Sequence, residues 1–381
     1  MNRRSRAALV VLTAVALQAP LVGALPAAHA ATAPPDGLSA SETRVWSKLN
    51  ERDGNARLRW TYTGRVEDAL GGYRLYSHDS MRPMKSASTM KAVTSAIALR
   101  LYGKDHLFPT KAFEGANPRE VVLRAGGDPL LTRGNLKTLA GRVATNIVAA
   151  LPSDYSSSTI SYTVLADDTL FGDATRPPGW VGTAYNRVRA FLLNRERTDD
   201  STRDAGISFA ASLAAALDAR LKDRGIDARV SYGGRGKTPE GATRLGTFLG
   251  HSVGDSIRTG LAWSDSNISE MLARHVAIAA GKPATREGEV AALREQLEDL
   301  GVFLDGVALY DGSGLSHYTK LTALTLVEVM QAAMRPEETR MNALRSLMMV
   351  AGRTGTLSTY YGRFVTSQSR CAIGYAWGKS G

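Results

Sequence analysis

A serine and a lysine lie three residues apart in the run Ser88-Thr89-Met90-Lys91. Residues three apart on a helix share a face, so this hydroxyl and this ammonium group lie within reach of each other. A lysine that becomes neutral through desolvation can take the proton of a serine, and the serine can then attack a carbonyl without any histidine. The spacing therefore predicts covalent chemistry with Ser88 as nucleophile and Lys91 as general base.

The flanking residues predict how this pair is held. Residues 73–77 alternate in polarity like a strand, and residues 78–83 have the composition of a turn. Residues 90–101 are rich in Ala, Val, Ile and Leu and contain no Pro or Gly, which is typical of a buried helix. Ser88 is thus expected where a loop enters a core helix, a position at which a serine can also serve simply as a helix cap.

The run from Met84 to Ser95 resembles the active-site segment of penicillin-binding D-alanyl-D-alanine carboxypeptidases, which usually read Pro-Ala-Ser-Thr-x-Lys. Penicillin-interacting serine enzymes carry Ser-x-x-Lys, then Ser-Asp-Asn, then Lys-Thr-Gly. Three further phrases resemble the class with a large insert after the first motif, the carboxypeptidase/endopeptidases of peptidase family S13. They are Gly126-Gly127-Asp128-Pro129-Leu130-Leu131, Asp167-Asp168-Thr169-Leu170-Phe171 and Pro177-Pro178-Gly179-Trp180.

This resemblance implies an α+β fold: a penicillin-binding, β-lactamase-like domain with an antiparallel sheet flanked by helices, plus an inserted mixed α/β domain. We expect the catalytic domain to be split between residues 31–105 and 250–381, with the insert at 106–249. Residues 1–30 have a basic start, an apolar middle and an Ala-x-Ala end, which indicate a signal peptide cleaved after Ala30. No later segment resembles a membrane span, so we expect an exported protein of the cell envelope or the extracellular space.

Composition limits the possible partners. The formal charge is +11, but acidic residues are interspersed and no stripe of basic and aromatic residues is present, so nucleic acid is a poor candidate. Attraction to an anionic envelope polymer fits this charge. The single cysteine, Cys371, excludes an internal disulfide and is expected to be a small buried residue of a strand. The six histidines lack the His-Glu-x-x-His spacing of a metallopeptidase, so neither metal nor cofactor is expected.

The second motif is expected at residues 264–267, where serines and an aspartate precede an apolar helical pattern. The resemblance gives Ser264 the part of the motif serine, which passes a proton to the leaving amine. The asparagine position holds Ser266, and Asn267 follows one residue later. Either residue is a candidate for the contact with the substrate amide. Residues 311–316, Asp-Gly-Ser-Gly-Leu-Ser, also match the family and are interpreted as a structural turn near the site.

Two segments resemble the third motif, Arg353-Thr354-Gly355 and Lys379-Ser380-Gly381. Residues 350–357 fit a Val-Ala-Gly-x-x-Gly-Thr-Leu segment that precedes the lysine motif in the family, so we choose residues 379–381. The resemblance implies that Lys379 and Ser380 hold the substrate carboxylate and that the strand backbone there supplies part of the oxyanion hole. Since the family's domain continues beyond this motif, we expect either a C-terminally truncated piece of a longer protein or a product too short to fold stably.

Together these residues imply an exported serine-type D-Ala-D-Ala carboxypeptidase, with endopeptidase action on cross-links as a second activity. Its partners would be peptidoglycan peptides ending in D-Ala-D-Ala, and β-lactams would inhibit it by acylating Ser88. One alternative is a catalytically impaired wall-binding or regulatory protein on the same fold. A β-lactamase is the other, but the large insert and residues 311–316 argue against it.

Overall fold

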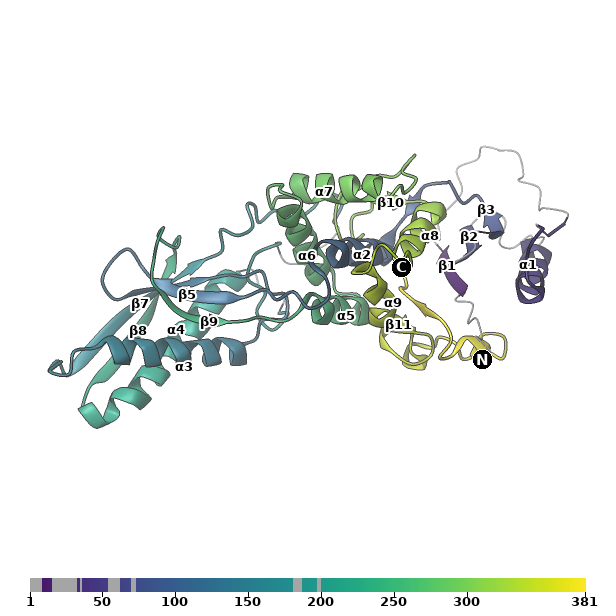
Figure 1. The fold of residues 1–381 in the computed structure, drawn as a ribbon. Helices are drawn as coiled ribbons and strands as arrows, with labels where there is room; N and C mark the ends of the chain where they lie inside the picture. The colour runs from purple at the N-terminus through teal and green to yellow at the C-terminus, as the bar shows by residue number, and fades with distance from the viewer. Residues whose placement is uncertain are drawn as a thin grey trace.

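The computed structural model describes residues 9–15, 33–34, 36–53, 62–69, 73–180, 187–196 and 200–381. Its helices are α1 (Ala40–Asp53), α2 (Met90–Tyr102), α3 (Arg133–Ala150), α4 (Ser201–Leu221), α5 (Val253–Trp263), α6 (Ser266–Ala279), α7 (Arg286–Asp299), α8 (Ala323–Ala332) and α9 (Leu344–Leu347). Its strands are β1 (Leu9–Val15), β2 (Tyr62–Asp68), β3 (Arg74–His78), β4 (Met84–Lys85), β5 (Thr110–Glu114), β6 (Glu120–Arg124), β7 (Thr159–Asp167), β8 (Asp227–Arg235), β9 (Arg244–Phe248), β10 (Lys320–Leu321), β11 (Met349–Val350) and β12 (Trp377–Gly378). The molecule is elongated, with the sheet of β5 to β9 at one end and the helices around α2 towards the other (Figure 1).

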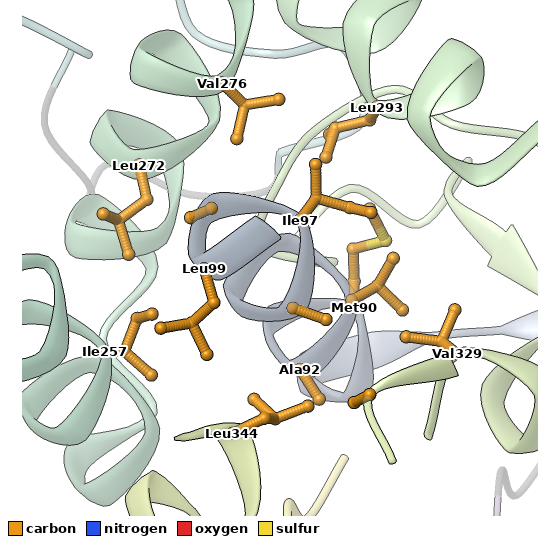
Figure 2. Close-up of a cluster of buried hydrophobic side chains, with 14 of the residues drawn as sticks. Met90, Ala92, Ile97, Leu99, Ile257, Leu272, Val276, Leu293, Val329 and Leu344 are labelled. Atoms are coloured by element: carbon orange, nitrogen blue, oxygen red, sulfur yellow. The ribbon is translucent and has the colours of Figure 1, made fainter. Parts of the chain in front are cut away.

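Helix α2 is the centre of the larger core. Every residue from Met90 to Leu99 is buried, so the helix has no face in water, as its uninterrupted apolar and small residues predict. Side chains from the surrounding helices enclose it, among them Ile257, Leu272 and Leu293 (Figure 2). Each fully buried aliphatic side chain contributes roughly 2 kcal/mol. The turn that precedes α2 is therefore attached to a helix that is buried on all sides.

Small antiparallel sheets surround these helices. Strands β1, β2 and β3 form one sheet, with α8 against β1 and β2 and with α1 against β3. Strand β4 pairs with β10, and β11 pairs with β12. The predicted α+β architecture, an antiparallel sheet flanked by helices, is confirmed.

A five-stranded mixed sheet with the order β8-β7-β6-β5-β9 makes up the second unit. Strands β6, β7 and β8 run parallel, whereas β5 is antiparallel to both of its neighbours. Helices α3 and α4 pack against each other and against this sheet. A separate core with Leu123, Val164 and Phe209 lies within this unit. The sequence prediction of a mixed α/β insert describes this unit well.

A buried histidine joins the insert to α6. The Nε2 atom of His275 donates to the carbonyl oxygen of Gly127 at 2.9 Å, and its ring stacks on Phe108 with centroids 3.8 Å apart. Gly127 has φ +72°, and a Cβ atom there would lie 2.4 Å from His275 Nε2, so only glycine fits. The Gly-Gly-Asp-Pro turn of the insert is thus tied directly to the helix that follows the predicted second motif.

The prediction for Cys371 is wrong: its side chain is exposed and lies in a short 3-10 helix, Arg370–Ala372, because strand β12 begins only at Trp377 and offers no sheet face to bury it. Most of the predicted signal peptide lies outside the described residues, and its described part, β1, pairs with β2. No helix in the described part of the chain is long and apolar enough to cross a bilayer.

Candidate active site

The predicted nucleophile and base lie together at the start of α2. Ser88 belongs to a single 3-10 turn, Ala87–Thr89, that leads directly into the helix. The Nζ atom of Lys91 donates to Ser88 Oγ at 3.1 Å and to the carbonyl oxygen of Ser313 at 2.8 Å. Lys91 is 1% exposed, whereas Ser88 is only half-buried. The hydroxyl is accordingly open to a substrate while the amine that contacts it is shielded from water.

Burial changes the acid–base chemistry of this lysine. It lowers the pKa of Lys91 from 10.5 to about 8, because the ammonium loses its hydration inside the protein. The negative charges of Glu270, Asp311 and Asp265 oppose the shift and raise the pKa again in part. A base with a pKa near the working pH is neutral often enough to accept a proton and still basic enough to hold it.

The loop of residues 311–316 holds Lys91 from one side. Asp311 is fully buried and accepts hydrogen bonds from Gly314 N, Ser316 N and Thr319 Oγ1 at 2.6 to 3.1 Å. Asp311 also accepts from Trp180 Nε1 of the insert at 2.9 Å. These donors fix the loop in one conformation, so the Ser313 carbonyl that meets Lys91 is held in place. The interpretation of these residues as a structural turn near the site agrees with this arrangement.

The second predicted motif lies at the junction of α5 and α6. Ser264 has φ +54°, an uncommon conformation for a residue other than glycine, and its side chain is half-buried. Asp265 caps α6 by accepting from Asn267 N and Ile268 N at 3.0 and 3.2 Å. Ser266 and Asn267 are both buried in the first turn. Within the described residues, no hydrogen bond joins the side chains of Ser264, Ser266 or Asn267 to Ser88 or Lys91, although the Asp265 charge acts on Lys91.

The last three residues meet the nucleophile turn. A Cβ atom on Gly381 would lie 3.1 Å from Thr89 Cγ2 and 3.3 Å from the Ser86 carbonyl oxygen. Lys379 is 5% exposed, and its pKa falls to about 7 through burial and through the positive charges of Lys91 and Arg363. The two buried lysines are therefore close enough to repel each other. Residues 379–381 were predicted to form the third motif, and Gly381 lies against the turn that contains Ser88.

The rejected third-motif segment has a supporting position. Arg353 is exposed, whereas Thr356 Oγ1 lies 3.0 Å from Ser380 Oγ. Gly355 has φ +52°, and a Cβ atom there would lie 2.7 Å from the Ala262 carbonyl oxygen. This segment therefore contacts both residues 379–381 and the end of α5.

The arrangement combines a hydroxyl, a neutralisable amine and a second buried cation. Such a set suits nucleophilic attack on a carbonyl whose substrate carries an anionic end. Sequence reasoning missed three contributors: Glu270, the Ser313 carbonyl and Thr356. Their importance depends on burial and on long-range contacts, for which the sequence offers only the Asp-Gly-Ser-Gly turn as a signal. No group of His, Cys, Asp or Glu side chains among the described residues could hold a metal ion.

Comparison with known proteins identifies relatives over most of the chain. The chain is 31% identical over 328 residues to the carboxypeptidase DacB of Mycolicibacterium smegmatis, covering 84% of this chain and 70% of the relative. It is 24% identical over 350 residues to the D-alanyl-D-alanine carboxypeptidase of an Actinomadura species, covering 70% of this chain and 63% of that protein.

Solved structures agree on the fold. Penicillin binding protein 4 of Haemophilus influenzae superposes with a TM-score of 0.62 at 16% identity, covering 81% of this chain and 82% of that chain. The same protein complexed with a novel β-lactam superposes with a TM-score of 0.57 at 18% identity, covering 86% and 84% of the two chains. Residues 47–188 and 197–381 match the model of one peptidase family. On this evidence the chain belongs to the D-Ala-D-Ala carboxypeptidase 3 (S13) family.

Proposed function

We propose that this chain is a serine-type D-Ala-D-Ala carboxypeptidase that acts on peptidoglycan peptides through an acyl-enzyme on Ser88. The observation that carries the proposal is the 3.1 Å contact between Lys91 Nζ and Ser88 Oγ, made by a lysine whose pKa burial lowers to about 8. The family and the carboxypeptidase names of the relatives support the same activity.

In the proposed reaction, Lys91 takes the proton of Ser88 as Oγ bonds to the carbonyl carbon between the two D-alanines. The tetrahedral intermediate then collapses, the C–N bond breaks and Ser264 passes a proton to the departing amine of D-alanine. Ser264 regains a proton from the Lys91 ammonium, which leaves Lys91 neutral again. Water, deprotonated by Lys91, afterwards releases the shortened peptide from Ser88. Lys379 as ammonium and the hydroxyl of Ser380 would bind the terminal carboxylate, and the backbone near Gly381 would supply an oxyanion donor.

Several finer assignments belong to the same proposal. Either Ser266 or Asn267 contacts the substrate amide, and residues 106–249 act as an insert within a catalytic domain split between 31–105 and 250–381. β-Lactams acylate Ser88, as the β-lactam complex of the Haemophilus protein suggests. Export depends on the signal peptide predicted at residues 1–30. Determining the N-terminal residue of the secreted protein tests whether cleavage follows Ala30.

Labelling with a fluorescent penicillin tests the nucleophile. We expect the full chain to become labelled and Ser88→Ala to take no label, because the alanine has no hydroxyl to acylate. Ser95→Ala, a buried serine of the same helix, is the matched control and should retain the label. Labelling of Ser88→Ala, or no labelling of a folded wild-type chain, would reject Ser88 as the nucleophile.

One observation favours a second candidate, a catalytically impaired wall-binding protein. The asparagine position of the second motif holds Ser266, whose shorter side chain reaches less far towards a substrate amide. Release of D-alanine from a peptide ending in D-Ala-D-Ala separates the two candidates. Labelled protein that releases no D-alanine would favour the impaired form, whereas turnover that Ser88→Ala abolishes would favour the enzyme.

A further inference from the structure

Four buried charged groups interact with one another, and two of them, Glu270 and Asp311, act on Lys91 without a direct part in the reaction above. Glu270 and Arg274 on α6, Glu289 on α7 and Asp311 in the loop are all 0% exposed. Burying unpaired charges is costly, so their protonation states must compensate one another. The contacts of each group show which of these charges acts on Lys91.

Arg274 contacts two carboxyl groups. Its Nη2 atom lies 2.6 Å from Asp173 Oδ1, and its Nε atom lies 3.3 Å from Glu289 Oε2. Asp311 accepts hydrogen bonds from its own donors in the loop. Glu270 lies on the Lys91 side of the cluster, because its charge acts on Lys91 more strongly than the charges of Asp311 and Asp265.

Glu270 and Glu289 act as a carboxyl pair. Burial and then the charge of Glu270 raise the pKa of Glu289 well above its ordinary value. Burial and then the charge of Asp311 raise the pKa of Glu270 to about 7. Two neighbouring buried carboxyls do not ionise together, so the pair retains a proton, with Glu289 as the protonated member.

The loop of residues 311–316 connects this pair to Lys91. Gly312 packs closely on α6, because a Cβ atom there would lie 2.5 Å from Ala273 Cβ and 3.3 Å from the Ser269 carbonyl oxygen. The hydroxyl of Ser313 and the amide of Gly312 lie beside Glu270, and the Ser313 carbonyl accepts from Lys91 Nζ. Among the charges that act on Lys91, Glu270 raises its pKa most.

Resting on the acyl-enzyme function proposed above, we propose that Glu270 is a positioning residue that stabilises the ammonium form of Lys91 through the Ser313 loop, while Glu289 keeps the proton of the carboxyl pair. The proton moves from Ser88 Oγ to Lys91 Nζ as Oγ bonds to the carbonyl carbon. Glu270 exchanges no atom or electron in this step and acts by its charge alone. Asp311, Asp265 and Lys379 also face Lys91, and they are unchanged in the variants below.

The test is the rate of acylation by fluorescent penicillin between pH 5.5 and 9. In Glu270→Gln the ammonium of Lys91 loses its counter-charge, so the pKa of Lys91 should fall. The rising, acidic limb of the profile of acylation rate against pH should therefore move to lower pH by about one unit, a tenfold change in proton concentration. The plateau above the limb should fall several-fold because Lys91 becomes a weaker base. Glu270→Asp keeps a carboxylate and should leave the limb near its wild-type position.

Glu289→Gln tests the second half of the proposal. A glutamine amide donates to Glu270 as the protonated Glu289 does, so the acidic limb should not move. Glu328→Gln, a half-buried carboxyl of α8 outside this cluster, controls for the loss of a carboxyl elsewhere and should also leave the limb in place. Thermal unfolding of each variant separates a loss of folding from a change in protonation.

The outcomes are distinct. A limb that stays in place in Glu270→Gln, or that moves equally in Glu270→Gln and Glu289→Gln, overturns the role of Glu270 while labelling of Ser88 continues. If Glu270→Gln does not fold, Glu289→Gln still tests the proposal. An acidic limb that moves to lower pH in Glu289→Gln would show that Glu289 is the ionised member of the pair, and would reject the assignment to Glu270. A folded wild-type chain without label would instead reject the proposed function itself.

Discussion

At the scale of single residues, the site contains two lysines with opposite requirements. Lys91 must be neutral to accept the Ser88 proton, whereas Lys379 must be an ammonium ion to bind a carboxylate. Burial lowers the pKa of Lys91 to about 8 and that of Lys379 to about 7, and the positive charge of Lys91 lowers the pKa of Lys379 further. The productive combination is consequently a minority state of the free protein. A bound carboxylate favours it by raising the pKa of Lys379.

This arrangement predicts a bell-shaped dependence of kcat/KM on pH, with its maximum between about 7 and 8. Activity rises as Lys91 loses its proton and falls as Lys379 loses its own. In Lys379→Arg the charge persists at alkaline pH, so the falling limb should disappear even if the maximum rate is lower. Release of D-alanine measured from pH 5.5 to 10 checks this. A falling limb retained in Lys379→Arg would assign that limb to another group.

At the scale of elements, the site depends on the close approach of the 311–316 loop to the turn before α2. Gly314 has φ +72°, and a Cβ atom there would lie 1.8 Å from the Ala87 carbonyl oxygen. The loop can reach Lys91 only because this residue has no side chain. Thr94 Oγ1 on α2 also donates to the Gly312 carbonyl at 2.6 Å and fixes the same approach.

Gly314→Ala should therefore displace the loop, remove the Ser313 carbonyl from Lys91 and reduce penicillin acylation at least tenfold, the factor that about 1.4 kcal/mol represents. The matched control is Gly301→Ala, since Gly301 has φ +70° but nothing within 4 Å of an added Cβ atom. This control should cost roughly 1 to 2 kcal/mol of stability through backbone strain alone and leave the acylation rate unchanged. Equal acylation rates in both variants would argue against the contact.

At the scale of the whole molecule, the insert and the catalytic helices are joined through His275. This side chain is fully enclosed, and burial lowers its pKa to about 4 although the Gly127 carbonyl acts in the opposite direction. The imidazole of His275 is therefore neutral in the folded protein. The ordinary pKa of 6.5 applies when the chain unfolds. The associated stability is fully present above pH 6.5 and is lost as the pH falls through 4.

His275→Gln should separate this effect from other titrations, because a glutamine amide can donate to Gly127 and does not ionise. At pH 7 the wild type should be the more stable protein. As the pH falls from 6.5 to 4, its free energy of unfolding should decrease relative to the variant by up to roughly 3 kcal/mol. Urea unfolding at both pH values measures the difference in free energy of unfolding between wild type and variant. The titration of Glu270 and of other groups that both proteins share cancels in this difference. A difference that does not change with pH would contradict a neutral buried His275.

The sequence by itself determined the local features of this protein. The composition of residues 90–101 was typical of a buried helix, and the spacing of Ser88 and Lys91 predicted that both side chains lie on one side of its start. Strand β3 was also predictable, because the alternating polarity of residues 73–77 is encoded within a few residues. Residues 379–381 were assigned by resemblance to a motif, without knowledge of what they contact.

Tertiary structure decided what depends on segments far apart in the chain. It brought Lys379 to Lys91, and it placed the Ser313 carbonyl and the Glu270 charge around the same amine. It also left Cys371 exposed, against expectation. The physical reason is common to all of these: pKa, burial and hydrogen bonding of a polar group depend on which neighbours exclude water from it, and those neighbours come from helices and loops distant in sequence.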